Sequence, residues 1–236
     1  MGRDVLPLTL DRLPDLPVDC RECVFWELTP ALSSRGRECP SEDKRGWLTT
    51  ALLEWGSPGR VAYVDGRPAG YITYAPAHLV PRSVAFPTSP VSADAVVLMT
   101  ARMDPRYAGQ GLGRVLIQSA AKDVLRRGGR AMEAYGSPGR AGECLLPTDF
   151  LLAVGFHTAR EHPAYPRMRL DLRTALRWRS EVEQAVEKLF APVRGLGARQ
   201  PQPVGTAHRE ETPGGVGHWF LHGLSVPRQE SHGAIS

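Results

Sequence analysis

The sequence predicts an α+β fold, in which helices pack on a mixed β-sheet. Two short runs rich in β-branched residues flank the turn dipeptide Asp65-Gly66, which is typical of a β-hairpin. An apolar run over 95–103 leads through a glycine cluster into an amphipathic segment, which is typical of a buried strand followed by a helix. Strands and helices therefore interleave along the chain, and a sheet covered by helices accommodates that order.

The composition is that of a globular protein with one core and some additional chain. The 236 residues exceed the roughly 150 of one typical domain. Hydrophobic residues make up 42% and charged residues 23%, which excludes a fibrous or wholly disordered chain. No run approaches the roughly 18 apolar residues of a membrane helix, and the first residues lack the features of a secretory signal. We therefore expect a cytoplasmic protein that binds no membrane.

The charge pattern says little about partners. A net charge of +4 is spread along the chain without any Lys/Arg tract. This pattern argues weakly for an anionic ligand and against nucleic acid. The four cysteines are too few for a disulfide scaffold of this length, so we expect reduced thiols.

Local signals place each predicted element in order. A helix begins after Ser41 with acidic residues in its first turn, carries apolar residues at 3.6-residue spacing, and ends near Gly56. The hairpin strands cover 59–64 and 69–74, and a loop with four prolines follows over 76–93. The later elements are a strand at 95–103, a helix from Leu112 to the Gly128-Gly129 pair, a strand at 130–135, a helix at 147–154, strands at 156–160 and 167–172, and a helix at 174–190.

These elements divide the chain into three parts. Residues 1–172 form the predicted folded domain, and 173–191 form a helix that packs on it or extends from it. Residues 192–236 contain five prolines and eight glycines, which predicts a disordered tail. The apolar patch 219–222 is the one part of this tail that we expect could dock on another surface.

The segment between the 95–103 strand and the next helix carries the chemistry. Gly109, Gly111 and Gly113 alternate there, so backbone N–H groups can converge where a helix begins. Such a helix start is a ready anion site, although a tight turn at a helix entry would use the same glycines. The segment lacks the Gly-Lys-Ser/Thr of nucleotide-binding phosphate loops and the spacing of a dinucleotide fingerprint.

The run M-D-P-R-Y-A-G-Q-G-L-G-R-V-L-I over 103–117 resembles motif A of the GNAT superfamily of N-acetyltransferases, V-x-P-x-x-R/Q-G-x-G-x-G. The order of elements over about 41–172 also resembles this family, with 6–17 as its first strand and exit. The resemblance implies a three-layer α+β fold with helices on both faces of a mixed central sheet.

The resemblance further implies that acetyl-CoA is the co-substrate. Its pantetheine arm would pair with the strand end at Ala101, Arg102 and Met103. Its pyrophosphate would bind backbone amides of Gly109, Gln110, Gly111, Leu112, Gly113 and Arg114.

The sequence departs from the family pattern at two positions. Ala108 replaces the arginine or glutamine before the first loop glycine, so Arg106, Gln110 or Arg114 would have to substitute. Leu151 replaces the frequent tyrosine that protonates the leaving thiolate. We expect this second change to slow turnover rather than abolish it, because a thiol with a pKa of roughly 8.5 is a tolerable leaving group.

Three residues are candidates for catalysis. The family offers a carboxylate on or beside the motif-A strand as the base that deprotonates an attacking amine, which indicates Glu133 or Asp94. Glu133 lies in the apolar run AMEAY, so it must face solvent, a cleft or a partner. Tyr135 is a candidate replacement for the missing acid. Solvated rim positions remain the structural alternative for both carboxylates, and an amphipathic edge position for the tyrosine.

Cys20, Cys23 and Cys39 raise the question of a zinc site. Structural zinc usually takes two Cys-x-x-Cys pairs, whereas this chain has only one. We therefore predict no metal and expect packed or surface thiols, with zinc as the open alternative.

The sequence as a whole predicts an acetyl-CoA-dependent N-acetyltransferase acting by direct attack of a primary amine. The acceptor pocket would be built by about 20–55 and 157–167, but the identity of the amine and the existence of a homodimer stay open. Two alternatives also stay open. One is an acetyl-CoA-binding regulatory or scaffold protein with little turnover, and the other is a zinc-stapled interaction module.

Overall fold

The computed structural model describes residues 2–33, 40–139 and 144–173. The chain divides into two units, Met1–Ala191 and Pro192–Ser236, and the first contains every described residue. The predicted helix at 174–190 and the predicted tail at 192–236 lie outside the described residues. Within the described part, no helix is long and apolar enough to cross a membrane.

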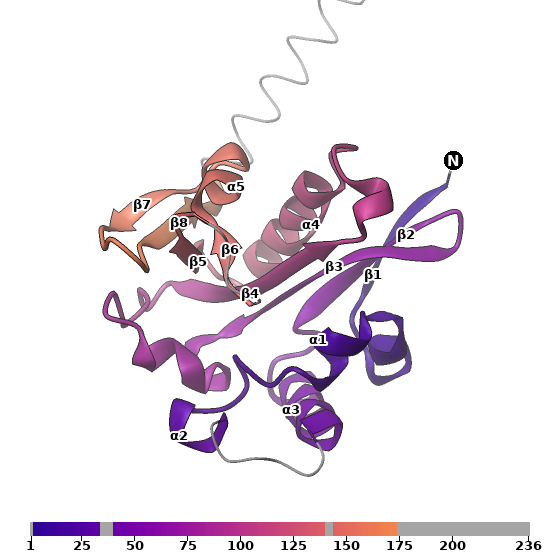
Figure 1. The fold of residues 1–236 in the computed structure, drawn as a ribbon, viewed down its shortest axis with the longest axis horizontal. Helices are drawn as coiled ribbons and strands as arrows, with labels where there is room; N and C mark the ends of the chain where they lie inside the picture. The colour runs from indigo at the N-terminus through magenta and orange to yellow at the C-terminus, as the bar shows by residue number, and fades with distance from the viewer. Residues whose placement is uncertain (1, 34–39, 140–143, 174–236) are drawn as a thin grey trace, which may run out of the picture. The chain divides into compact units, whose positions relative to one another are not determined.

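A mixed eight-stranded sheet forms the centre of the domain (Figure 1). The order along it is β1-β2-β3-β4-β5-β8-β7, and β6 pairs with β5 off this path. The pairs β4–β5 and β5–β6 are parallel, and the others are antiparallel. The strands are β1 Arg3–Pro7, β2 Gly59–Val64, β3 Arg67–Pro76, β4 Ala95–Met103, β5 Ala131–Ser137, β6 Leu146–Pro147, β7 His157–Arg160 and β8 Arg167–Asp171.

Helices cover both faces of this sheet, with α3 and α1 on one side and α4 on the other (Figure 1). This arrangement confirms the three-layer α+β prediction. The α-helices are α1 Val18–Glu22, α2 Pro30–Ser33, α3 Pro40–Glu54, α4 Leu112–Arg126 and α5 Thr148–Ala153. Short 3-10 turns are η1 Leu10–Asp15, η2 Ala77–Leu79, η3 Pro81–Ala85 and η4 Pro105–Tyr107.

The apolar periodicity of α4 explains its position. Residues such as Leu116, Ile117 and Val124 recur on one face of the helix and are fully buried in the core over β3, β4 and β5. The predicted β-hairpin and both long helices are confirmed, and the proline-rich loop after β3 contains η2 and η3. The short strand β6 was not predicted, because two residues carry no periodic signal.

A buried acid fastens α4 to the sheet. The side chain of Asp123 is only 6% exposed, and Arg60 of β2 approaches it at 2.6 Å. Tyr74 of β3 donates a hydrogen bond to it at 2.7 Å, and Arg127 lies 2.8 Å away. Burial acts to raise the pKa of Asp123, but the hydrogen bonds from Tyr74 and Arg126 and the arginine charges outweigh it and lower the pKa below its usual value.

We predict that Asp123→Asn lowers the free energy of unfolding at pH 7 by about 3 kcal/mol, because Arg60 is left buried without its counter-charge. The folded-state pKa of Asp123 is depressed, so its contribution is complete above the unfolded-state pKa of roughly 4 and is lost as the pH falls through the folded value. Urea denaturation at pH 7 and at acid pH measures both effects.

Asp4→Asn, at an exposed position on β1, is the matched control and should change stability by less than about 0.5 kcal/mol. An Asp123→Asn deficit that is the same at both pH values would contradict the role assigned to the ionised carboxylate.

Candidate active site

A glycine loop, defined here as residues 109–114, joins the end of β4 to the start of α4. Gly109 and Gly111 have φ of 74° and 76°, in the left-handed region that favours glycine. Gly111 is the N-cap of α4, and a Cβ added at either glycine would meet no atom within 4 Å. Gly113 differs, because a Cβ there would come within 3.1 Å of the Phe150 ring. Two of the glycines thus shape an open surface, and the third permits helix packing.

The amides of this loop have no backbone partners. In the described part of the chain, no backbone hydrogen bond is formed by the N–H groups of 109–114, and the first amide to donate into the helix is that of Val115, to Gly111 at 3.2 Å. The amides of 112–114 belong to the first turn of α4, at the positive end of its dipole. The loop can therefore bind an anion such as a pyrophosphate through its main chain alone.

The side chains beside the loop are already engaged. Arg106 pairs with Asp104 at 2.6 Å, and Arg114 donates to the carbonyl of Ala153 at 2.8 Å. Arg3 of β1 lies next to Gln110 and donates to its carbonyl at 3.4 Å, a contact that sequence reasoning missed because the two residues lie 107 positions apart. The backbone amides therefore remain the principal hydrogen-bond donors for an anion at this loop.

The sheet splits beside the glycine loop. The strands β4 and β5 pair only at Ala95↔Ala131, Val96↔Met132 and Val97↔Glu133. Beyond Val97, the edge of β4 that faces β5 has no strand partner among the described residues. Strand β5 instead pairs with β6 near its end and with β8 along its other edge. The predicted positions 101–103 lie on this open edge and pair with β3 on the other side. An open edge offers N–H and C=O groups to an extended, amide-bearing ligand.

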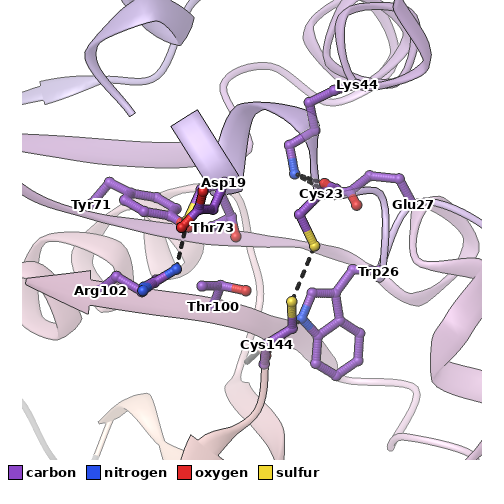
Figure 2. A pocket seen from close by; sticks show the side chains of 11 residues that line it. Asp19, Cys23, Trp26, Glu27, Lys44, Tyr71, Thr73, Thr100, Arg102 and Cys144 are labelled. Atoms are coloured by element: carbon purple, nitrogen blue, oxygen red, sulfur yellow. Dashed lines mark hydrogen bonds and ion pairs between the residues drawn. The ribbon is translucent and has the colours of Figure 1, made fainter. Parts of the chain in front are cut away.

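A cavity of about 210 Å³ lies between this part of the sheet and the segment around α1 (Figure 2). Its lining combines acids, bases, hydroxyl groups and three thiols, so it suits a polar ligand better than an apolar one. The lining residues are Asp19, Cys20, Cys23, Trp26, Glu27, Lys44, Tyr71, Thr73, Thr100, Arg102 and Cys144.

A buried ion pair in this cavity leaves one carboxylate oxygen without a partner. Lys44 of α3 forms an ion pair with Oε1 of Glu27 and donates a hydrogen bond to the carbonyl of Cys23 at 3.0 Å. The other oxygen, Oε2 of Glu27, is buried and accepts no hydrogen bond. Buried polar atoms are nearly always paired, so this orphaned oxygen of a cavity-lining residue is a candidate acceptor for a ligand donor.

Residues 22–140 match the model of the Acetyltransferase (GNAT) family. The chain belongs to the GNAT family. A Salmonella typhimurium acetyltransferase, YncA, solved with its cofactor acetyl-CoA, is 15% identical over 73% of this chain and 95% of its own, with a TM-score of 0.50.

Two further solved GNAT-like structures give lower scores. The PaiA N-acetyltransferase of Thermoplasma acidophilum, in complex with coenzyme A, is 15% identical over 72% of this chain and 99% of its own, with a TM-score of 0.49. The Escherichia coli GNAT protein YhbS, in complex with CoA, is 21% identical over 74% of this chain and 84% of its own, with a TM-score of 0.42. No curated protein matches this sequence.

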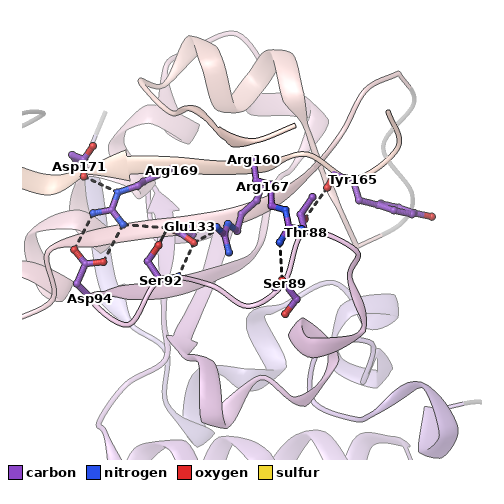
Figure 3. A network of polar contacts seen from close by, with 10 residues as sticks. All are labelled: Thr88, Ser89, Ser92, Asp94, Glu133, Arg160, Tyr165, Arg167, Arg169 and Asp171. Atoms are coloured by element: carbon purple, nitrogen blue, oxygen red, sulfur yellow. Dashed lines mark hydrogen bonds and ion pairs between the residues drawn. The ribbon is translucent and has the colours of Figure 1, made fainter. Parts of the chain in front are cut away.

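In this GNAT chain, the predicted bases Glu133 and Asp94 belong to one ion-pair network (Figure 3). Glu133 is fully buried, and its carboxylate accepts hydrogen bonds from Ser92 Oγ at 2.6 Å and from Arg169 at 3.1 Å. Arg167 lies 3.3 Å from its other oxygen. Arg169 also donates a hydrogen bond to each carboxylate oxygen of Asp94, at 3.0 and 2.9 Å, and these hydrogen bonds lower the pKa of Asp94. An acid in an apolar run was expected to need a partner, and Glu133 forms ion pairs with two arginines of β8.

Tyr135 and Leu151 lie in the core rather than at the cavity. Tyr135 is 1% exposed and stacks on Phe86 with ring centroids 4.1 Å apart. Burial raises the pKa of Tyr135. Leu151 is fully buried in the core under α4, so it offers no proton donor where the family often has tyrosine. The tyrosine that lines the cavity is Tyr71.

The cysteines do not form a metal cluster in the described residues. No group of three or more His, Cys, Asp or Glu side chains there could hold a metal ion, and Cys39 lies outside that part. Cys20 accepts a hydrogen bond from Arg102 at 3.1 Å, whereas the sulfur of Cys23 contacts the sulfur of Cys144.

The ion-pair network leads to a prediction for Glu133→Gln. Removing the charge leaves Arg167 and Arg169 with fewer acceptors, so we expect the free energy of unfolding to fall by about 2 kcal/mol. The acetyl-transfer rate per folded molecule should change by less than about tenfold, because the carboxylate is saturated. Denaturation and steady-state kinetics on the same preparation measure the two effects. Unchanged stability with a rate loss of about 100-fold or more would instead support Glu133 as the base.

Proposed function

We propose that this GNAT chain transfers the acetyl group of acetyl-CoA to a primary amine by direct attack. The observation that carries the proposal is the row of unpartnered amides in the glycine loop, which lies beside the open edge of β4. Both features bind through the main chain, so neither depends on the side chains in which the sequence departs from the family motif.

The donor site fits acetyl-CoA. The open space above Gly109 and Gly111 leaves room for a pyrophosphate, with loop amides as its hydrogen-bond donors. Residues 101–103 would hold the pantetheine amides by strand-like pairing. The thioester, when bound there, supplies an activated acetyl carbonyl. The acetyl-CoA in the Salmonella typhimurium structure of the same fold supports this assignment.

The acceptor site fits a protonated amine. A rotation of the Glu27 carboxylate would present its unpaired Oε2 to an ammonium group in the cavity, and Lys44 holds the other oxygen. We assign the proton-accepting role to Glu27 rather than to Glu133 or Asp94, because the arginines of β8 already occupy those two carboxylates. The free amine then attacks the carbonyl, the carbon–sulfur bond breaks, and the thiolate leaves.

A second candidate function is supported by Leu151, which is buried where the family often places its proton donor. A chain that binds acetyl-CoA without turnover would act as a sensor or scaffold. Release of free thiol from acetyl-CoA in the presence of a panel of primary amines distinguishes the two functions. Tight binding without amine-dependent thiol release would favour the sensor and contradict the enzyme.

We predict that Gly111→Glu eliminates acetyl-CoA binding, measured by isothermal titration calorimetry. The new carboxylate would occupy the anion site, and its charge would repel the pyrophosphate. Gly66→Glu is a matched control, because Gly66 also has a positive φ, of 75°, and open space around it, but lies in the β2–β3 hairpin. Both variants carry a similar backbone strain of about 1–2 kcal/mol, and only Gly111→Glu should lose the ligand. Equal affinities of the two variants would contradict the proposed loop.

We predict that Glu27→Gln lowers kcat/KM for the amine by about 10²-fold or more and leaves the affinity for acetyl-CoA unchanged, because only the acceptor side loses its base. Thiol release at varied amine concentration measures the first quantity, and calorimetry the second. The double variant Glu27→Gln/Lys44→Met removes the unpaired buried cation, so it controls for misfolding. A wild-type rate in a folded Glu27 variant would remove this residue from the mechanism.

A further inference from the structure

Two thiols from distant parts of the chain meet at the wall of the cavity. Cys23 directly follows α1, and Cys144 lies just before β6. Their sulfur atoms are 3.1 Å apart, although the residues are 121 positions apart in the sequence (Figure 2). The resemblance to the family and the proposed acetyl transfer give neither thiol a role.

The backbone of both residues is anchored. Trp26 donates its indole N–H to the carbonyl of Cys144 at 3.1 Å. Lys44 donates to the carbonyl of Cys23 at 3.0 Å. These two hydrogen bonds keep the sulfurs facing each other, and the sulfurs need to approach by only about 1 Å to reach the length of a disulfide bond.

The surroundings also favour reaction. Both thiols are partly exposed and line the cavity, so a small oxidant can reach them. The hydrogen bond from Cys144 lowers the pKa of Cys23 to about 6, with a smaller contribution from the charge of Lys44. Cys23 is therefore mostly thiolate at neutral pH, which is the nucleophilic form. The same contact and burial raise the pKa of Cys144, which stays a thiol.

We propose that Cys23 and Cys144 are a redox modification site at which a peroxide forms a reversible disulfide in the wall of the cavity. The Cys23 thiolate attacks one peroxide oxygen, the O–O bond breaks, and a sulfenic acid forms with release of hydroxide. The Cys144 sulfur then attacks the sulfenic sulfur, the S–O bond breaks, and water leaves. In total, two thiols and one hydrogen peroxide give one disulfide and two waters. A dithiol restores both thiols by exchange.

Two consequences follow for the cavity. The disulfide ties the end of α1 to the segment before β6 across the cavity wall. It also removes a negative thiolate from the surroundings of Glu27, which weakens the attraction for an ammonium group. The second consequence rests on the proposed function, whereas the disulfide itself does not. The glycine loop is not part of the cavity, so acetyl-CoA binding should persist.

The test uses the full chain carrying Cys39→Ser, so that Cys20, Cys23 and Cys144 are its only thiols. Hydrogen peroxide should lower the intact mass by about 2 Da, the two hydrogens lost on disulfide formation. Peptide mapping should join Cys23 to Cys144, and dithiothreitol should reverse the change. Cys23→Ser and Cys144→Ser should each prevent disulfide formation, whereas Cys20→Ser is the matched control and should preserve it. A disulfide joining Cys20 to Cys23, or no disulfide at all, would overturn the proposal.

In the thiol-release assay, oxidation should raise KM for the amine by at least tenfold and leave acetyl-CoA affinity unchanged. An unchanged KM in the oxidised, active protein would overturn the effect on the acceptor side. A Cys23–Cys144 disulfide that forms while no amine supports turnover would sustain the redox site and contradict only the acetyl-transfer function.

Discussion

The early end of pairing between β4 and β5 is the constraint on which the site depends. The two parallel strands pair only where Ala95–Val97 of β4 lies opposite 131–133 of β5, and beyond these residues they no longer pair. The Glu133 network lies at the last paired position and joins β5 to β8, which keeps β5 with its antiparallel neighbour. Because β4 continues toward the glycine loop with β3 on one side only, its open edge leads to the unpartnered amides of that loop. A sheet in which β4 and β5 paired along their whole length would leave no such edge.

The same strand connects the donor side to the acceptor side. Thr100 and Arg102 of β4 line the cavity, and 101–103 form the open edge. A thioester held along that edge would therefore lie next to the cavity that Glu27 lines. The thiols of Cys23 and Cys144 lie in the wall of that cavity, where a covalent bond between them would act on the acceptor and spare the donor.

Local signals predicted most of the fold and the position of the glycine loop. The Asp65-Gly66 turn, the apolar run of β4 and the alternating glycines each act over a few residues, so the sequence could reveal them. The cavity could not be predicted in this way. Glu27, Lys44 and Cys144 come from three separate segments, and only the packing of α1 and α3 on the sheet brings them together. The apolar run around Glu133 predicts that this acid needs a partner. It does not predict which partner, because the arginines of β8 are distant in sequence and come close only when β8 pairs with β5.

A crystal structure of the complex with acetyl-CoA tests the account most directly. The account predicts pyrophosphate oxygens within about 3 Å of the amide nitrogens of Gly111 and Gly113, with the pantetheine arm paired along 101–103 of β4. Acetyl-CoA bound elsewhere on the protein, with those amides free of phosphate and the β4 edge empty, would contradict it.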